Sequence, residues 1–151
     1  MHYERITRLL ASCALLVAGF ALAGPGAVGQ VSEPVHDDFQ RQVKDVLFDF
    51  DTHESPADID ALNTNAQWLK EHPQVRFSLE GYTDPNGDLV YNLALAQRRA
   101  NTVENTLIEM GISPSRIRSS IGWGELYQTC HDQTEECWHR NRRVTFEYAS
   151  E

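Results

Sequence analysis

Residues 77–100 read FSLEGYTDPNGDLVYNLALAQRRA, and this stretch predicts a strand, a polar loop and the beginning of a long helix. Val75, Phe77 and Leu79 alternate with polar residues, which is typical of a strand buried on one face. The loop at 83–87 contains a proline and an Asn-Gly pair, and both favour a turn. Asp88 then supplies a side chain that can cap the first turn of a helix.

The helix predicted after Asp88 has one apolar stripe, whose members recur at three- and four-residue spacing. They are Leu93, Ala96, Ala100, Val103, Leu107 and Met110. Gly111 is expected to end the helix, with Pro114 just beyond it. Arg98 is expected to point away from the stripe toward water, whereas Arg99 lies on its flank, where an arginine can bury its aliphatic stem.

Three polar residues of this stretch form a candidate ligand site. Asp84 lies in the loop, and Asn92 and Arg99 are seven residues apart, which places them on nearly the same helix face. One acid, one base and one amide suit a zwitterionic ligand, such as a free amino acid group, and favour binding over catalysis. An equally supported alternative is structural, in which Arg99 pairs with an acid such as Glu80 or Glu104.

The rest of the chain supplies the other elements of a single domain. Strands are expected at Val46–Phe50, Arg116–Trp123 and Arg143–Tyr148, a helix from Pro56 to about Glu71, and a polar loop at 125–140. The order strand-helix-strand-helix-strand-strand predicts an α+β fold, with one mixed sheet and its helices packed on one face.

The first 23 residues have the pattern of a secretory signal peptide, because a short basic start precedes an apolar run at 9–23 that is short for a membrane span. We expect cleavage after Ala23, a flexible lead-in at 24–43 and the domain at 44–149. Two alternatives keep the chain at a membrane. Cys13 follows a lipobox-like Leu-Ala-Ser and could be lipidated, or the N-terminal segment stays as an uncleaved anchor.

The formal net charge of −9 argues against a nucleic-acid partner and against charge-driven binding to an anionic membrane. The sequence contains no nucleophile-elbow, zinc-protease, P-loop or dinucleotide-binding motif. We therefore expect no enzyme activity, no cofactor and no bound metal.

Cys130 and Cys137 lie in the polar loop, close to His131 and His139. These four residues raise the alternative of a metal site, but their spacing matches no common zinc pattern. Since the compartment of an exported chain is oxidising, a disulfide between the two cysteines is favoured.

The chain resembles the OmpA-like peptidoglycan-binding domain over about residues 44–149. The matching segments are Val46–Asp51, Glu80–Asp84, Tyr91-Asn92 with Leu95 and Arg98-Arg99-Ala100, Gly111, Gly122–Glu125 and Asn141–Val144. They occur in one unbroken order, and their combination is specific. Ala96 stands where a serine is frequent, and Gln128 where a proline is common, so the loop near Gln128 is expected to differ in shape.

This resemblance implies a non-catalytic domain that binds the peptide stem of peptidoglycan, chiefly its diaminopimelate. Asp84 matches the family's key aspartate and is expected to meet the ligand ammonium. Arg99 matches its key arginine and is expected to hold the ligand carboxylate with two parallel hydrogen bonds. Asn92 matches an asparagine that orders the loop and contacts the ligand.

The same resemblance implies further contacts around the pocket. Thr83 and the segment from Asp49 to Asp51 are expected to line it largely through their backbones. Either Arg142 or Arg143 is expected to add positive charge at its rim, and the resemblance does not decide between them.

Together these inferences predict a peptidoglycan-binding protein of the bacterial envelope, located in the periplasm at the outer membrane or the cell wall and tethering the envelope to the wall. The alternative is an envelope protein-interaction module with weak or no peptidoglycan binding. A pull-down with purified cell-wall sacculi separates the two hypotheses, because only the first predicts that the protein sediments with the wall.

Overall fold

The computed structural model describes residues 33–149. In chain order its elements are α1 (Glu33–Gln42), β1 (Val46–Leu47), α2 (Ile59–Glu71), β2 (Arg76–Tyr82), α3 (Leu89–Glu109), the short 3-10 helix η1 (Pro114–Arg116), β3 (Ile117–Gly124), α4 (Glu135–Asn141) and β4 (Arg143–Ala149). The predictions for the signal peptide and Cys13 fall outside the described residues.

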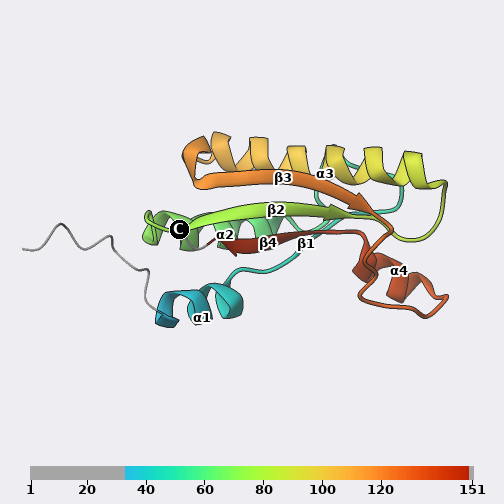
Figure 1. The fold of residues 1–151 in the computed structure, drawn as a ribbon, viewed down its shortest axis with the longest axis horizontal. Helices are drawn as coiled ribbons and strands as arrows, with labels where there is room; N and C mark the ends of the chain where they lie inside the picture. Colours follow the sequence, from blue (N-terminus) through green and yellow to red (C-terminus); the bar gives the residue numbers. More distant parts are fainter. Residues whose placement is uncertain (1–32, 150–151) are drawn as a thin grey trace, which may run out of the picture.

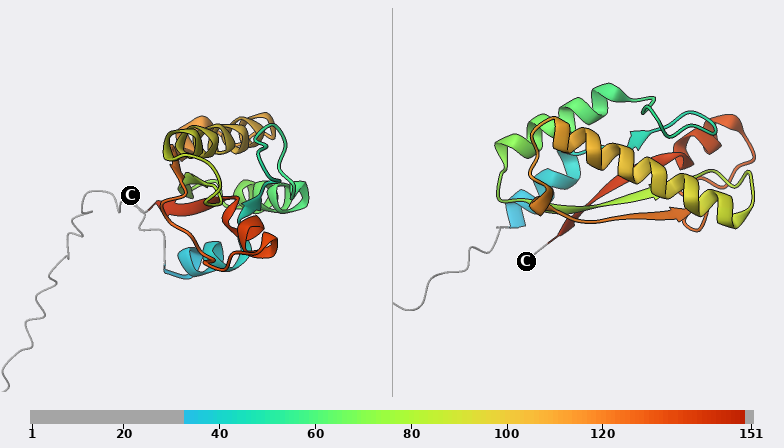
Figure 2. Two further views of the ribbon diagram at one scale, coloured as in Figure 1. Left: turned by 90° about the vertical axis from the view of Figure 1, so that its right-hand side faces the viewer. Right: turned by 90° about the horizontal axis from the view of Figure 1, so that it is seen from above.

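The four strands form one sheet in the order β1-β4-β2-β3 (Figure 1). β4 pairs antiparallel with both β1 and β2, whereas β2 and β3 are parallel, with α3 and η1 in the connection between them. In the two further views α3 runs along β2 and β3, α2 lies on the same side of the sheet, and α1 lies next to β4 (Figure 2). The predicted α+β fold with one mixed sheet is confirmed.

The core lies between this sheet and the helices. Alternate residues of the two central strands point into it, namely Phe77 and Leu79 of β2 and Val144 and Phe146 of β4. The intervening residues of β2 lie on the other face and are half-buried. This alternation is the one predicted for a strand buried on one side.

The lead-in predicted to be flexible is helical from Glu33 onward, so that prediction is wrong for this part of the range. Phe39 is 1% exposed and packs edge-on against the rings of Trp68 and Tyr148. The indole nitrogen of Trp68 also donates a hydrogen bond of 2.9 Å to the carboxylate of Asp38. The acidic residues around Phe39 are typical of a disordered segment, but the buried Phe39 ring holds the helix against the core.

Two other elements differ from their predictions. The first strand is only two residues long, and Phe50, predicted to lie in it, is 60% exposed on the following loop. The predicted polar loop at 125–140 contains the start of α4, where the Thr134 hydroxyl caps the helix by accepting from the Cys137 amide. Between residues 33 and 149, no helix combines the length and hydrophobicity that crossing a bilayer requires.

The bounds of α3 agree with the prediction, whereas Arg99, predicted on the flank of the apolar stripe, is fully buried, and Leu95 is buried where Leu93 was expected. The N-cap of α3 is Asp88, and Gly111 follows its C-terminus with φ +94°.

The position of the helix depends on two glycines. A Cβ at Gly81 of β2 would lie 2.2 Å from the Ala96 carbonyl oxygen, and one at Gly122 of β3 would lie 2.3 Å from a backbone nitrogen of α3. The helix can therefore approach both strands closely, which places the side chains of its first turns against the end of β2.

Candidate functional site

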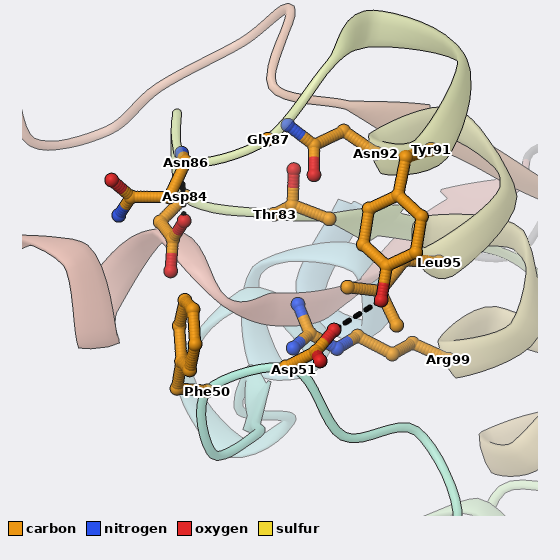
Figure 3. A pocket seen from close by; sticks show the side chains of 10 residues that line it. All are labelled: Phe50, Asp51, Thr83, Asp84, Asn86, Gly87, Tyr91, Asn92, Leu95 and Arg99. Carbon is orange, nitrogen blue, oxygen red and sulfur yellow. Dashed lines mark hydrogen bonds between the residues drawn. The ribbon is translucent and has the colours of Figure 1, made fainter.

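A cavity of about 190 Å³ lies where β2 ends, between the loop after β1 and the N-terminal turns of α3. Its lining residues are Phe50, Asp51, Thr83, Asp84, Asn86, Gly87, Tyr91, Asn92, Leu95 and Arg99. In the close view Arg99 lies below the cavity, Asp84 on one side and Asn92 above, with Thr83 between them (Figure 3). The structure thus brings together the three residues that the sequence predicts as a site.

Arg99 is held in place by the backbone of two separate segments. Its Nε donates to the Thr52 carbonyl at 2.8 Å, Nη1 to the Tyr82 carbonyl at 3.0 Å and Nη2 to the Asp49 carbonyl at 2.9 Å. The guanidinium also lies 5.3 Å from the ring centre of Phe48. A guanidinium has more N–H groups than these three bonds use, so it keeps donors for a ligand.

The charge of Arg99 is not neutralised by a direct ion pair. Within residues 33–149 it forms no salt bridge, and the predicted alternative of pairing with Glu80 or Glu104 is not realised. Burial lowers its pKa to about 10, although the field of Asp84 opposes this shift. A buried cation whose polar partners are neutral carbonyls favours an incoming anion.

Asp84 is also buried and is fixed by two contacts. Its Oδ1 accepts from the Asn86 amide at 2.9 Å, which holds the loop in an Asx-type turn. Its Oδ2 lies 3.0 Å from Nη1 of Arg142. Since each carboxylate oxygen has two lone pairs, both oxygens can still accept from a ligand.

Thr83 contributes differently from the prediction. Both of its backbone groups are used within the protein, because its amide donates to the Gly124 carbonyl and its carbonyl accepts from the Gln128 side chain. Its side chain lines the cavity, and the buried hydroxyl has no hydrogen-bond partner. A buried polar atom without a partner costs stability, so this hydroxyl is available to bind a group that enters the cavity.

Asn92 is almost fully buried at the top of the cavity. Its amide nitrogen donates to a carboxylate oxygen of Glu125, which ties α3 to the loop after β3. Its carbonyl oxygen points toward the cavity in Figure 3. Gly87 lies beside it with φ +114°, so a side chain here would be strained and would crowd Asn92.

Sequence reasoning expected the segment from Asp49 to Asp51 to line the cavity through its backbone, but it missed the aromatic side chains at the mouth. Tyr91 and Phe50 both line it, although they are 42% and 60% exposed. The Tyr91 hydroxyl donates to the carboxylate of Asp51 and so closes one side of the mouth (Figure 3). Asp51 has a φ of +55°, which is unusual for a residue with a side chain. Two exposed aromatic residues flanking a predicted site are the signal that would have pointed to this rim.

The structure also separates the two arginines that the resemblance leaves undecided. Arg142 contacts Asp84, although it does not line the cavity. Arg143 packs 4.0 Å from the ring centre of Tyr82 and does not line the cavity either. Asp49 does not line the cavity, and its carbonyl accepts a hydrogen bond from Nη2 of Arg99.

The predicted disulfide between Cys130 and Cys137 is present. It closes the segment that precedes and begins α4. Over residues 33–149 there is no group of three or more metal-binding side chains, and the alternative of a metal site in this loop is not supported.

The site thus presents a buried cation at its base, a buried carboxylate on one side, a free hydroxyl between them and an amide above. Such an arrangement complements a group that carries an ammonium and a carboxylate on one carbon atom. A cavity this small holds only one end of a longer molecule, because pockets for drug-sized ligands are about 300–1,000 Å³.

Known proteins resemble this chain in sequence and in fold. Residues 47–142 match the family described as the OmpA family. The peptidoglycan-associated lipoprotein of Brucella melitensis is 36% identical over 123 residues, which cover 80% of this chain and 72% of the relative. The crystal structure of the peptidoglycan-associated lipoprotein from Burkholderia pseudomallei has a TM-score of 0.64 and 33% identity, covering 70% of this chain and 90% of that one. A putative MotB-like protein from Desulfovibrio vulgaris has a TM-score of 0.57 and 27% identity, with 70% and 68% of the two chains covered.

Proposed function

Since the chain belongs to the OmpA family, we propose that it is a non-catalytic module of the bacterial envelope that binds peptidoglycan and tethers the envelope to the wall. Its relatives are named for their association with peptidoglycan. In this proposal the chain is exported to the periplasm and acts at the outer membrane or the cell wall.

The observation that carries the proposal is the buried guanidinium of Arg99, which lines a cavity and has no salt bridge within residues 33–149. A ligand carboxylate that reaches it gains charge-assisted hydrogen bonds in a site shielded from water. Asp84 on the neighbouring wall receives the ligand ammonium, and the Thr83 hydroxyl gains the partner that it otherwise lacks.

This charge pattern selects among the diamino acids found in stem peptides. The free end of diaminopimelate carries an ammonium and a carboxylate, whereas the side chain of lysine ends in an ammonium alone. A lysine stem would leave Arg99 without an anion and would also leave part of the cavity unfilled. We therefore propose that the protein binds diaminopimelate stems in preference to lysine stems.

The test is co-sedimentation with purified sacculi, followed by calorimetry with soluble stem peptides that differ only at the diamino acid. The full-length protein should sediment with diaminopimelate-containing sacculi and bind the matching peptide at least about tenfold more tightly than the lysine peptide. Asp84→Asn should lose sedimentation while keeping its circular dichroism spectrum. Equal affinity for both peptides, or unchanged sedimentation of the variant, would refute this assignment of the site.

A second candidate function is docking to another envelope protein, with weak or no binding to peptidoglycan. It is favoured by apolar side chains left exposed near the cavity at the start of α3, where Val90 is 75% and Leu89 is 47% exposed. The sedimentation assay separates the two candidates, because a protein-docking module stays in the supernatant when sacculi are the only binding partner offered.

A further inference from the structure

Glu135 lies outside the cavity but is linked to it through Arg142. The side chain of Arg142 is 2% exposed, and its guanidinium lies between two carboxylates: Nη1 is 3.0 Å from Oδ2 of Asp84, and Nη2 is 2.5 Å from Oε1 of Glu135. Its Nε donates to the Phe48 carbonyl at 3.1 Å. One buried cation is thus shared by an acid of the cavity and an acid of α4.

The surrounding chain fixes Glu135 for this contact. Glu135 is the first residue of α4, directly after the N-cap Thr134, and Arg142 follows the last residue of the same helix. The disulfide joins the first turn of α4 to Cys130. The buried Asn141 side chain also binds both backbone groups of Cys130, with a nitrogen–oxygen distance of 2.8 Å for the bond that it donates. Both ends of α4 are therefore tied to one segment.

Together with Arg99, whose positive charge also interacts with Asp84, these three residues determine how strongly Asp84 attracts a cation. Asp84 and Arg142 alone would form a neutral pair, which has little net attraction for a ligand ammonium. With Glu135 the group has a net charge of −1. Burial lowers the pKa of Arg142, but its hydrogen bonds to Glu135 and Asp84 raise it above the ordinary arginine value, so it stays charged.

We infer that Glu135 is a positioning residue of the binding site, which shares Arg142 with Asp84 and so preserves the attraction of Asp84 for the ligand ammonium. This inference rests on the proposed function. It concerns recognition of the ligand ammonium by Asp84, on which Glu135 acts through Arg142. It assigns a role in ligand discrimination to an acid whose side chain is 67% exposed and does not line the cavity.

The test compares two ligands in the full-length protein by calorimetry. One is a stem peptide with unmodified diaminopimelate, and the other has the distal amino group acetylated, which removes the ammonium and keeps the carboxylate. Wild type should prefer the unmodified peptide. Glu135→Gln should reduce this preference by about fivefold, mainly through weaker binding of the unmodified peptide. Glu136→Gln is the matched control, because it removes the same charge from the next residue of α4, which is exposed, and should leave the preference unchanged.

The outcomes are distinct. A reduced preference in Glu135→Gln but not in Glu136→Gln supports the inference. If both peptides weaken equally, Glu135 only maintains the shape of the loop and the inference is wrong. An unchanged preference in Glu135→Gln also overturns it while leaving the proposed function intact. Failure of wild type to bind the unmodified peptide overturns the proposed function, and this inference with it.

Discussion

Arg99 and Arg116 bind the backbone in the same way, but Arg99 lines the cavity and Arg116 does not. Each guanidinium donates three hydrogen bonds to carbonyl oxygens of residues at least 17 positions away in the chain. The bonds of Arg116 secure the end of α2 and the turn that leads to β2. The chain therefore contains its own control for separating what Arg99 does for stability from what it does for a ligand.

We predict that Arg99→Lys and Arg116→Lys lower the free energy of unfolding by similar amounts, about 2 kcal/mol each, because a lysine cannot donate to three carbonyls in one plane. Denaturant titration measures this loss. Only Arg99→Lys should also lose co-sedimentation with sacculi. If Arg116→Lys loses binding to the same extent, the effect at Arg99 reflects stability and the proposed contact with a ligand carboxylate is refuted.

A second prediction uses the unpartnered hydroxyl of Thr83. Thr83→Val keeps the shape of the side chain and removes a buried polar atom without a partner, so the free energy of unfolding should stay constant or rise by up to about 1 kcal/mol. Affinity for a diaminopimelate peptide should nevertheless fall about tenfold, because the ligand loses one hydrogen bond. A variant that is more stable and binds as well as wild type would show that the hydroxyl faces an unoccupied part of the cavity.

Much of the site could be predicted because it depends on helix periodicity and on one loop. Asn92 and Arg99 share a helix face through their seven-residue spacing, and Asp84 belongs to the turn just before that helix. The free hydroxyl of Thr83 could not be predicted, since the groups around Thr83 come from distant parts of the chain, such as Gly124 and Gln128, which bind its backbone and lie more than 40 residues away. Spacing along the chain does not encode which group of a residue stays unpaired.

The choice between Arg142 and Arg143 could not be predicted either, because it depends on how β4 pairs with its neighbouring strand. Arg142 is the C-cap of α4 and Arg143 is the first residue of β4, so the backbone turns between them and only Arg142 contacts Asp84. This outcome depends on the pairing of β4 with β2, where Val144 lies opposite Gly81. Likewise, α1 was missed because its stability comes from Phe39 packing on distant rings and not from a strong local pattern.

The third prediction concerns the close packing of α3 on β2. Gly81→Ala places a methyl group 2.2 Å from the Ala96 carbonyl oxygen, which should destabilise the fold by about 1–3 kcal/mol and move α3 away from Tyr82. The bond from Arg99 to the Tyr82 carbonyl would lengthen, so ligand affinity should fall even when the variant is fully folded.

Gly111→Ala is the control for this change, because nothing lies within 4 Å of its new methyl group and only its φ of +94° is unfavourable. It should lose about 1 kcal/mol of stability and keep its ligand affinity, as measured by calorimetry below the unfolding transition. Equal affinity in both glycine variants would show that the packing distance does not govern the site.

The fourth prediction is that stability depends on pH through Glu147, on the sheet face opposite the core. Burial raises the pKa of Glu147 above its ordinary value of 4.5, and the neighbouring Glu80 and Asp45 raise it further, against the field of Arg143. Between pH 4.5 and the raised pKa, the folded state therefore binds more protons than the unfolded state. The free energy of unfolding consequently falls as the pH rises through this interval.

Glu147→Gln should remove this decline. We expect its Tm to exceed that of wild type by about 2 °C at pH 7, with the gain disappearing below pH 4.5. Glu54→Gln is the matched control, because it removes the same charge from an exposed loop between β1 and α2, away from any helix end. It should show no such pH-dependent gain. A gain of the same size at both pH values would contradict the assigned cause, since it would not depend on ionisation of Glu147.

The last prediction concerns the disulfide, which joins Cys130 to the first turn of α4, where Glu135 lies. Replacing both Cys130 and Cys137 by serine should lower the free energy of unfolding by about 2.5 kcal/mol, the chain-entropy value for a loop this short. The reductant dithiothreitol should produce the same loss in wild type and none in the double variant. Ligand affinity should fall less than in Glu135→Gln, because Asn141 still binds the backbone of residue 130 and holds α4 close to Asp84. A larger loss of affinity in the serine variant would instead show that the covalent bond, and not the Asn141 side chain, keeps Glu135 and Arg142 in contact.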